Sequence, residues 1–154
     1  MKQLLARDLI RGQTGVATIN INGNIEEMFY LKNLDANVEK NKDTVRTIGK
    51  FGDQHKSNGF NGTGTMTIHT VTSIFRRMML DFVKNGVDQY FTITTTNEDP
   101  NSTVGAQTTV LHNCNLDSVN IANIDIDENS LEEEVSFTFD DYDLLEEFRR
   151  PSNM

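Results

Sequence analysis

The chain has 154 residues, a single cysteine and a formal net charge of −9, which is the size of one domain with a substantial buried core. This acidity excludes a typical nucleic-acid reader, which needs clustered lysines and arginines against phosphates, and the lone Cys114 excludes an intrachain disulfide and fits assembly in a reducing cytoplasm. Because the sequence shows neither a signal peptide nor an apolar run long enough to span a bilayer, we expect a soluble protein that binds no membrane.

The first elements in chain order are an arm and a β-hairpin. Residues 1–14 have no clear period and are predicted to form an N-terminal arm. Residues 15–21 alternate apolar and polar side chains, as a half-buried strand does. Asn22-Gly23 follows, and this pair is the strongest short signal for a hairpin turn because both turn positions need a positive φ. The returning strand is expected to start near Ile25 and to run to Val38.

Residues 39–61 lose this alternation and are predicted to form a long, polar and basic surface loop. Loops of this length are uncommon in compact domains and are usually functional or mobile. We hypothesise that the loop reaches an adjacent copy of the chain, because residues 125–147 contain eleven acids and no base and opposite charges attract between copies. Two ordinary solvated surfaces are the alternative interpretation. The candidates for contacts between subunits or rings are Lys40, Lys42, Arg46, Lys50 and Lys56 in the loop, and Glu132, Glu134 and Asp140 in the acidic segment.

The second half of the chain is predicted to hold one helix among several strands. Apolar side chains recur at helical spacing over about residues 72–85, which predicts an amphipathic helix. Strands are expected at 63–71, 90–96, 106–111, 116–126 and 131–139, and residues 144–150 are expected to add a short helix or to dock on a neighbour. The fold class is therefore mainly β: a single domain over 1–154, a β-sandwich or barrel, with one flanking helix.

The search for catalytic and ligand-binding motifs yields only fragments. The glycines of 59–65 lack the Gly-Lys-Ser/Thr ending of a phosphate loop and precede a strand, so they are interpreted as tight turns into it. Asp125, Asp127 and Asn129 have the opening spacing of a calcium loop but lack its glycine and its final glutamate. His112 and Cys114 lie two residues apart, so they are expected to share a strand face, and a filler role for the thiol is favoured over a Cys–His pair. We expect no enzyme, no cofactor and no metal site.

Several stretches taken together resemble a known family. They are ANVEKNK at 36–42, NGTGT at 61–65, VTS at 71–73, DQYFT at 88–92, IA with DID within 121–127, and LEEEV followed by FTF within 131–139. Their order and spacing over roughly 34–143 are similar to those of the tail tube proteins of contractile phages, of Bacillus-type defective prophages and of phage-tail-like bacteriocins.

The resemblance implies a structural subunit that assembles with itself into hexameric rings, which stack into a hollow inner tail tube. It implies a tail sheath protein outside, a tape-measure protein in the channel, and baseplate and tail-terminator proteins at the ends. Assembly would take place in the host bacterial cytoplasm, and the product would be a virion or a phage-tail-like particle. The alternatives are a type VI secretion-type tube, another baseplate or tail subunit, and a monomeric ligand-binding β-barrel.

A threonine-rich strand offers candidates for the lining of such a channel. DNA that slides through a tube must not adhere to it, and each contact of a lysine or arginine with phosphate adds affinity. Short polar side chains avoid such contacts. The lumen candidates are therefore Thr92, Thr94 and Thr96, with Thr65 and Thr67 as further possibilities, and DNA is expected to pass without specific binding if the particle is a phage.

Overall fold

The computed structural model describes residues 5–9, 15–27, 31–70 and 72–151, and it confirms the expected mainly-β class. Eight antiparallel strands and one α-helix occur in this described part, after a short 3-10 helix at Ala6–Asp8. The elements are β1 (Gly15–Ile21), β2 (Asn24–Glu27), β3 (Leu31–Val45), β4 (Gln54–His69), α1 (Ile74–Asn85), β5 (Phe91–Glu98), β6 (Ala106–Val119), β7 (Glu132–Phe139) and β8 (Asp141–Glu146).

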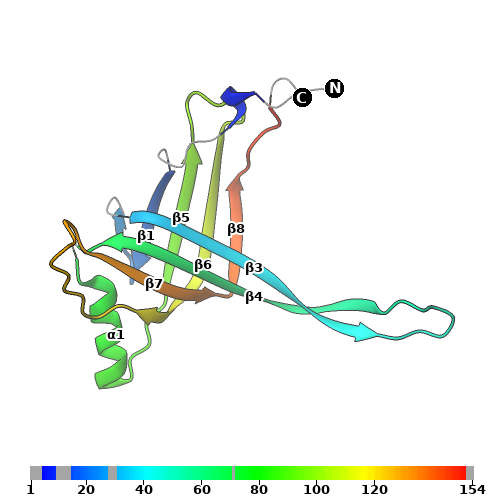
Figure 1. Ribbon diagram of the computed structural model, residues 1–154, viewed down its shortest axis with the longest axis horizontal. Coiled ribbons are helices and arrows are strands. Elements are labelled where there is room, and N and C mark those ends of the chain that lie inside the picture. The colour runs from blue at the N-terminus through cyan, green and yellow to red at the C-terminus, as the bar shows by residue number, and fades with distance from the viewer. Residues whose placement is uncertain (1–4, 10–14, 28–30, 71, 152–154) are drawn as a thin grey trace.

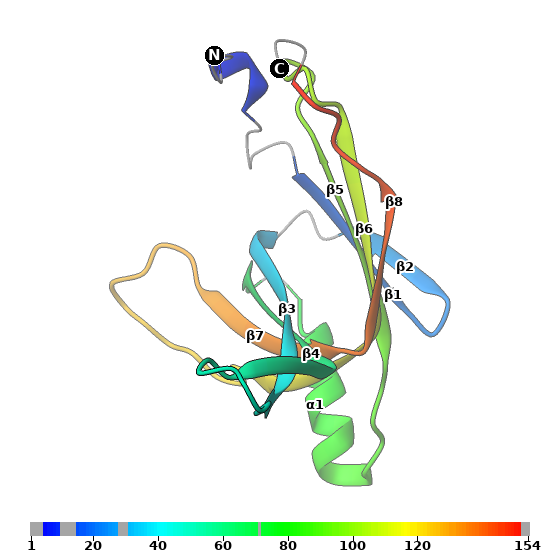
Figure 2. The same cartoon turned by 90° about the vertical axis from the view of Figure 1, so that its right-hand side faces the viewer.

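The strands form one continuous sheet that folds into two layers. Its order is β2-β1-β5-β6-β7-β4-β3, and β8 pairs with β6. Figures 1 and 2 show β1, β5, β6 and β8 in one layer, while β3, β4 and β7 cross in front of it in the other. The helix α1 lies at the lower end of both layers. This is a sandwich-like arrangement of antiparallel strands with one flanking helix.

Strand β6 connects the two layers. Its first part pairs with β5 and β8, and its last part, Asn115 to Val119, pairs with β7. The register shifts between Phe91 and Ile93 on β5, opposite Asn113, which has a φ of 53°. A bulge of this kind bends a strand and lets it change layers.

The core lies between the two layers. Apolar side chains of β1, β5 and β6 meet those of β4 and β7, and Phe75 and Met78 of α1 close one end. Ring centroids of Phe75 and Phe91 are 6.1 Å apart, and those of Phe91 and Phe137 are 6.4 Å apart, within the range of favourable aromatic pairs. The fully buried members are Ile19, Met66, Ile68, Phe75, Ile93, Cys114, Val135 and Phe137.

The turn and helix signals are confirmed. Asn22 and Gly23 have φ values of 52° and 86° between β1 and β2. The amide of Gly23 also donates a hydrogen bond to Oδ1 of Asn20 at 3.0 Å. Helix α1 ends at Gly86, which adopts the left-handed conformation with a φ of 68°, as glycine does after a helix.

The long loop predicted over 39–61 is wrong for most of its length. Strand β3 extends to Val45 and β4 begins at Gln54, and the two remain paired out to Val45 and Gln54. Only residues 46–53 connect them. Because all of 39–61 is exposed, neither face carries the apolar period that marks a half-buried strand.

Two other expectations need correction, and a third lies partly outside the described residues. The strands expected at 106–111 and 116–126 are one strand, β6, which ends at Val119. The segment 144–150 holds no helix, because 141–146 forms strand β8 against β6. Of the expected N-terminal arm at 1–14, residues 1–4 and 10–14 lie outside the described residues.

Two glycines of β4 are needed for close packing and not for a turn, in contrast to the sequence interpretation. A Cβ atom on Gly64 would lie 2.3 Å from Cζ of Phe137, and one on Gly62 would lie 2.6 Å from Cε2 and from the carbonyl oxygen of Phe139. Neither glycine has a positive φ. The aromatic rings of β7 therefore lie directly over the bare backbone of β4.

A buried ion pair joins α1 to the start of β7. Nε of Arg76 lies 2.7 Å from Oε2 of Glu133, whose side chain is fully buried. The same Nε–H donates a hydrogen bond to the carbonyl oxygen of Asn120 at 2.9 Å, and within the described chain the Glu133 carboxylate accepts none. Burial raises the pKa of Glu133 above its ordinary value of 4.5, and the charge of Arg76 opposes this shift.

Gly64→Ala is expected to lower the free energy of unfolding by about 1–3 kcal/mol, because the added methyl group displaces the Phe137 ring from a packed core. Urea titration followed by circular dichroism measures the change. Gly52→Ala is the matched control, since a Cβ at Gly52 meets nothing within 4 Å. Equal stability of the two variants would contradict the packing role of Gly64.

Glu133→Gln is expected to change how stability depends on pH. Because the pKa of Glu133 is higher in the folded state, its contribution is fully present below about pH 4.5 and is lost as pH rises through the folded-state pKa. The stability of the wild type relative to the variant should therefore fall with rising pH, by about 1.4 kcal/mol for each unit of pKa shift. Urea titrations over a pH series measure this. A difference that is independent of pH would refute it. Glu134→Gln, at an exposed position of the same strand, is the matched control for loss of a carboxylate.

Candidate assembly surfaces

The five basic candidates lie together on one projecting structure. Lys40 and Lys42 are on β3, Lys56 is on β4, and Arg46 and Lys50 are in the connection between them. We call the hairpin formed by residues 39–61 the arm. It leaves the body and extends away from both layers (Figure 1). The sequence predicted these residues in one segment, but as a loop and not as two paired strands.

Within the described residues, the outer part of β4 pairs with β3 and with no other strand. Gly62 is the last residue of β4 that pairs with β7, so residues 54–61 continue beyond it for about 26 Å at roughly 3.3 Å per residue. The register shifts between Lys40 and Lys42, beside Gly59 with its φ of 114°. Asn61 donates a hydrogen bond from Nδ2 to Oδ1 of Asn41 at 3.3 Å at this bulge.

The three acidic candidates lie on or directly after β7, and Glu132 and Glu134 share one face of that strand. Glu132 accepts hydrogen bonds from Nζ of Lys32 at 2.9 and 3.2 Å. Glu134 is exposed on β7 opposite Thr67. Asp140 follows β7 and accepts from Nδ2 of Asn113 at 3.0 Å with both carboxylate oxygens. Two of the three therefore have partners within their own chain.

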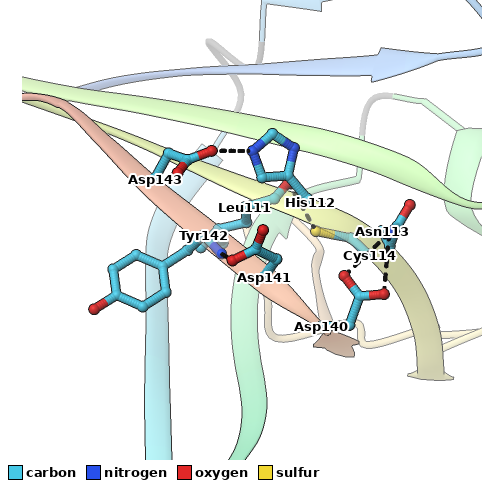
Figure 3. A network of polar contacts seen from close by, with 8 residues as sticks. All are labelled: Leu111, His112, Asn113, Cys114, Asp140, Asp141, Tyr142 and Asp143. Atoms are coloured by element: carbon cyan, nitrogen blue, oxygen red, sulfur yellow. Dashed lines mark hydrogen bonds and ion pairs between the residues drawn. The ribbon is translucent and has the colours of Figure 1, made fainter.

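The pair of His112 and Cys114 is separated by the bulge at Asn113. Figure 3 shows Nε2 of His112 against Asp143, at 2.8 Å, while Cys114 points to the other side of the strand. The thiol donates to the carbonyl oxygen of Leu111 at 3.5 Å, and burial raises its pKa to about 12. The expectation that both side chains share a face is wrong, and Cys114 is a protonated core residue and not a nucleophile.

Thr92, Thr94 and Thr96 lie on one face of β5, directed away from the core. Their neighbours Phe91 and Ile93 are buried, and residues directly opposite in an antiparallel pair share a face. Thr94 therefore shares its face with Thr18 and Val110, and the rest of this face includes Asn20, Thr108, Asp143 and Glu146. Strands β1, β2, β5, β6 and β8 contain no lysine or arginine. The layer thus presents a neutral to acidic surface, which we call the threonine face.

Thr65 and Thr67 are separate from this face. They alternate with the buried Met66 and Ile68 on β4, and β4 belongs to the other layer (Figure 2). Their side chains are therefore directed away from the core on the opposite side of the sandwich. The two groups of threonines cannot line the same channel surface of one subunit.

A small cavity lies beside helix α1 in the described part of the chain. This cavity of about 100 Å³ lies between α1 and the end of β6, lined by Met78, Phe82, Gln89 and Leu116 among others, and it is smaller than typical ligand pockets. No group of three His, Cys, Asp or Glu side chains in the described residues is arranged to hold a metal ion. None of the described helices is long and apolar enough to cross a membrane.

A second exposed surface was not predicted from the sequence. The connection from β6 to β7, residues 120–131, carries the exposed side chains of Ile121, Ile124 and Ile126 beside acidic residues. It was expected to be mainly strand because these isoleucines alternate with polar residues. Isoleucines that alternate with polar residues give the same period in an exposed loop as in a half-buried strand, so the period alone does not distinguish the two.

Comparison with known proteins agrees with this architecture. The family model described as phage tail tube protein matches residues 2–146. The phage-like element PBSX protein XkdM of Bacillus subtilis (strain 168) is 44% identical over 143 residues, which cover 93% of this chain and 95% of that protein.

Two solved structures are similar in fold at low sequence identity. The tube-terminating cap of the anti-feeding prophage has a TM-score of 0.70 at 10% identity, covering 94% of this chain and 96% of that one. A chain of the extended sheath–tube complex of the extracellular contractile injection system PVC has a TM-score of 0.65 at 14% identity, covering 88% and 90%. Together with the family match and the PBSX relative, the projecting arm and the open sheet place this chain in the phage tail tube protein family, whose members are structural subunits and not enzymes.

Proposed function

We propose that this chain forms hexameric rings, which stack into the inner tube of a contractile, phage-type tail. The family match and the PBSX relative support the tube, and similarity to chains of contractile particles supports the contractile type. The partners would be further copies of the chain, a sheath protein outside, a tape-measure protein in the channel, and baseplate and terminator proteins at the ends. Assembly would occur in the host cytoplasm before incorporation into the particle.

The observation that carries this proposal is the unsupported arm. A two-stranded hairpin on its own is marginally stable in water, and here one extends for about 26 Å beyond its last contact with β7. Such an arm gains its stabilising contacts from another chain. A subunit that must be completed by its neighbours is suited to a polymer.

Open strand edges supply a second means of association. In the described sheet, β2 and β3 are the end strands and β8 pairs only with β6. Exposed edges present unpaired N–H and C=O groups, which are a hazard unless another strand covers them. Closure of a ring would pair these edges between neighbouring copies, and stacking of rings through unlike surfaces would extend the tube.

The threonine face is the candidate lining of the channel. It carries hydroxyl side chains and carboxylates together with Asn20, Val16 and Val110, and its strands contain no lysine or arginine. Phosphate would therefore find no cationic partner on it, so that DNA would pass without specific binding. Thr65 and Thr67, on the other layer, would face a neighbour or the sheath.

Replacing residues 41–59 with Asn-Gly is expected to abolish tube formation while the body stays folded. Lys40 and Phe60 are partners in the β3–β4 ladder, so a two-residue turn closes it without strain. Negative-stain microscopy of purified protein or particles scores tubes, and thermal unfolding checks the body. Tubes of normal length from the shortened chain would contradict the role of the arm.

A cryo-EM map of the assembled tube is expected to show Thr92, Thr94 and Thr96 on the channel wall. The physical reason is the absence of cationic side chains from their layer. A channel lined by the lysines of the arm, or by helix α1, would refute this assignment. The same map counts the subunits in each ring.

A further inference from the structure

The connection between β6 and β7 displays apolar side chains to solvent in a charged setting. We call residues 120–131 the distal loop. Ile124 and Ile126 are 98% and 96% exposed, and Ile121 is also exposed. The loop contains the acids Asp125, Asp127 and Glu128 and no base. Exposed apolar side chains rimmed by one sign of charge are typical of a docking surface.

The distal loop is held in place at both ends. At one end Asn120 donates to the carbonyl oxygen of Glu134 at 3.4 Å and accepts from Arg76, which is paired with the buried Glu133. At the other end the amide of Thr70 donates to the carbonyl oxygen of Leu131 at 2.9 Å.

The top of the loop is a turn. The amide of Asp127 donates to Oδ1 of Asp125 at 3.0 Å, and that of Glu128 to the carbonyl oxygen of Asp125 at 3.4 Å. Ile124 precedes this turn, and Ile126 is its second residue. The isoleucines are thus presented by a hydrogen-bonded frame, which lowers the entropic cost of docking.

The end of the arm has the complementary composition. We call residues 46–53 the arm tip. Ile48 and Phe51 in it are fully exposed, and Arg46 and Lys50 are the neighbouring bases. Asp53 is 3.6 Å from Arg46 in an exposed ion pair, which leaves the tip with a net positive charge. Apolar side chains with basic neighbours on one surface match apolar side chains with acidic neighbours on the other.

One copy of the chain cannot bring these two surfaces together. Figure 1 shows the arm tip at one end of the longest axis of the molecule and the distal loop at the other end. The β3–β4 and β4–β7 ladders lie between them and fix their separation. The partner of each surface must therefore belong to a different molecule.

We propose that the arm tip of one copy docks on the distal loop of a second copy. Ile48 and Phe51 pack against Ile124 and Ile126, while Arg46 and Lys50 lie near Asp125, Asp127 and Glu128. This inference rests on the proposed self-assembly and names the surface that receives the arm. Because the arm tip and the distal loop lie at opposite ends of each copy, the contact is head-to-tail, and the rotation between copies decides whether it closes a ring or extends the tube.

Cysteine cross-linking tests the contact. Phe51→Cys and Ile126→Cys are combined in one chain, and assembled protein is treated with a mild oxidant. Cys114 is buried with its pKa raised to about 12, so it gives little background. The expected result is a ladder of covalent multimers on a denaturing gel. A mixture of the two single variants should give covalent dimers and nothing larger.

The matched control combines Phe51→Cys with Ile25→Cys, since Ile25 is exposed on β2, away from the distal loop. Its ladder is expected to be at least tenfold weaker. Tubes or rings in the microscope with no Phe51–Ile126 ladder, or with an equal ladder from the control, would overturn this inference and leave the proposed function standing. A protein that forms neither rings nor tubes, and gives no ladder, would overturn both.

Discussion

Pairing of β3 with β4 is the interaction on which the rest of the structure depends. In its inner half, β4 lies between β3 and β7, and the rings of Phe137 and Phe139 pack against Gly64 and Gly62. In its outer half the same ladder continues, and among the described residues it gains no third strand and buries no side chain. One pair of strands is therefore both a core element and an arm, and the core anchors the arm in a fixed direction.

Apolar side chains are buried between the two layers of the body and are almost fully exposed at the arm tip and the distal loop. Inside the body, apolar side chains are removed from water by the facing layer. At the arm tip and the distal loop, isoleucine and phenylalanine remain in water, and burying each of them would contribute about 1.5–3 kcal/mol. Charges of opposite sign at the two ends favour contact between unlike ends over contact between like ends. The monomer does not gain the free energy of burying these side chains. Contact between unlike ends of successive copies would gain it, and a polymer built by such contacts has a defined direction.

Local sequence signals predicted most elements of the body. They failed for the exposed arm and for the bulged part of β6. The Asn22-Gly23 turn and helix α1 follow from residues whose conformational demands are local. The arm strands were missed because full exposure removes the apolar alternation from both of their faces. The continuation of β6 past Cys114 was missed because the bulge at Asn113 reverses the alternation. The sequence predicted that the basic contact candidates lie in one segment, and they all lie on the arm. It did not predict the distal loop as a surface, because the exposure of its isoleucines is known only from the structure.

Perturbed ionisation usually marks a functional site, and in this chain it marks the interior instead. Burial raises the pKa of Cys114 and of Glu133, and both side chains are fully buried. Glu133 holds Arg76 in the position from which Arg76 binds the carbonyl oxygen of Asn120, at the base of the distal loop. The contribution of this buried carboxylate to function is therefore indirect: it stiffens the base of the surface that we propose meets another copy.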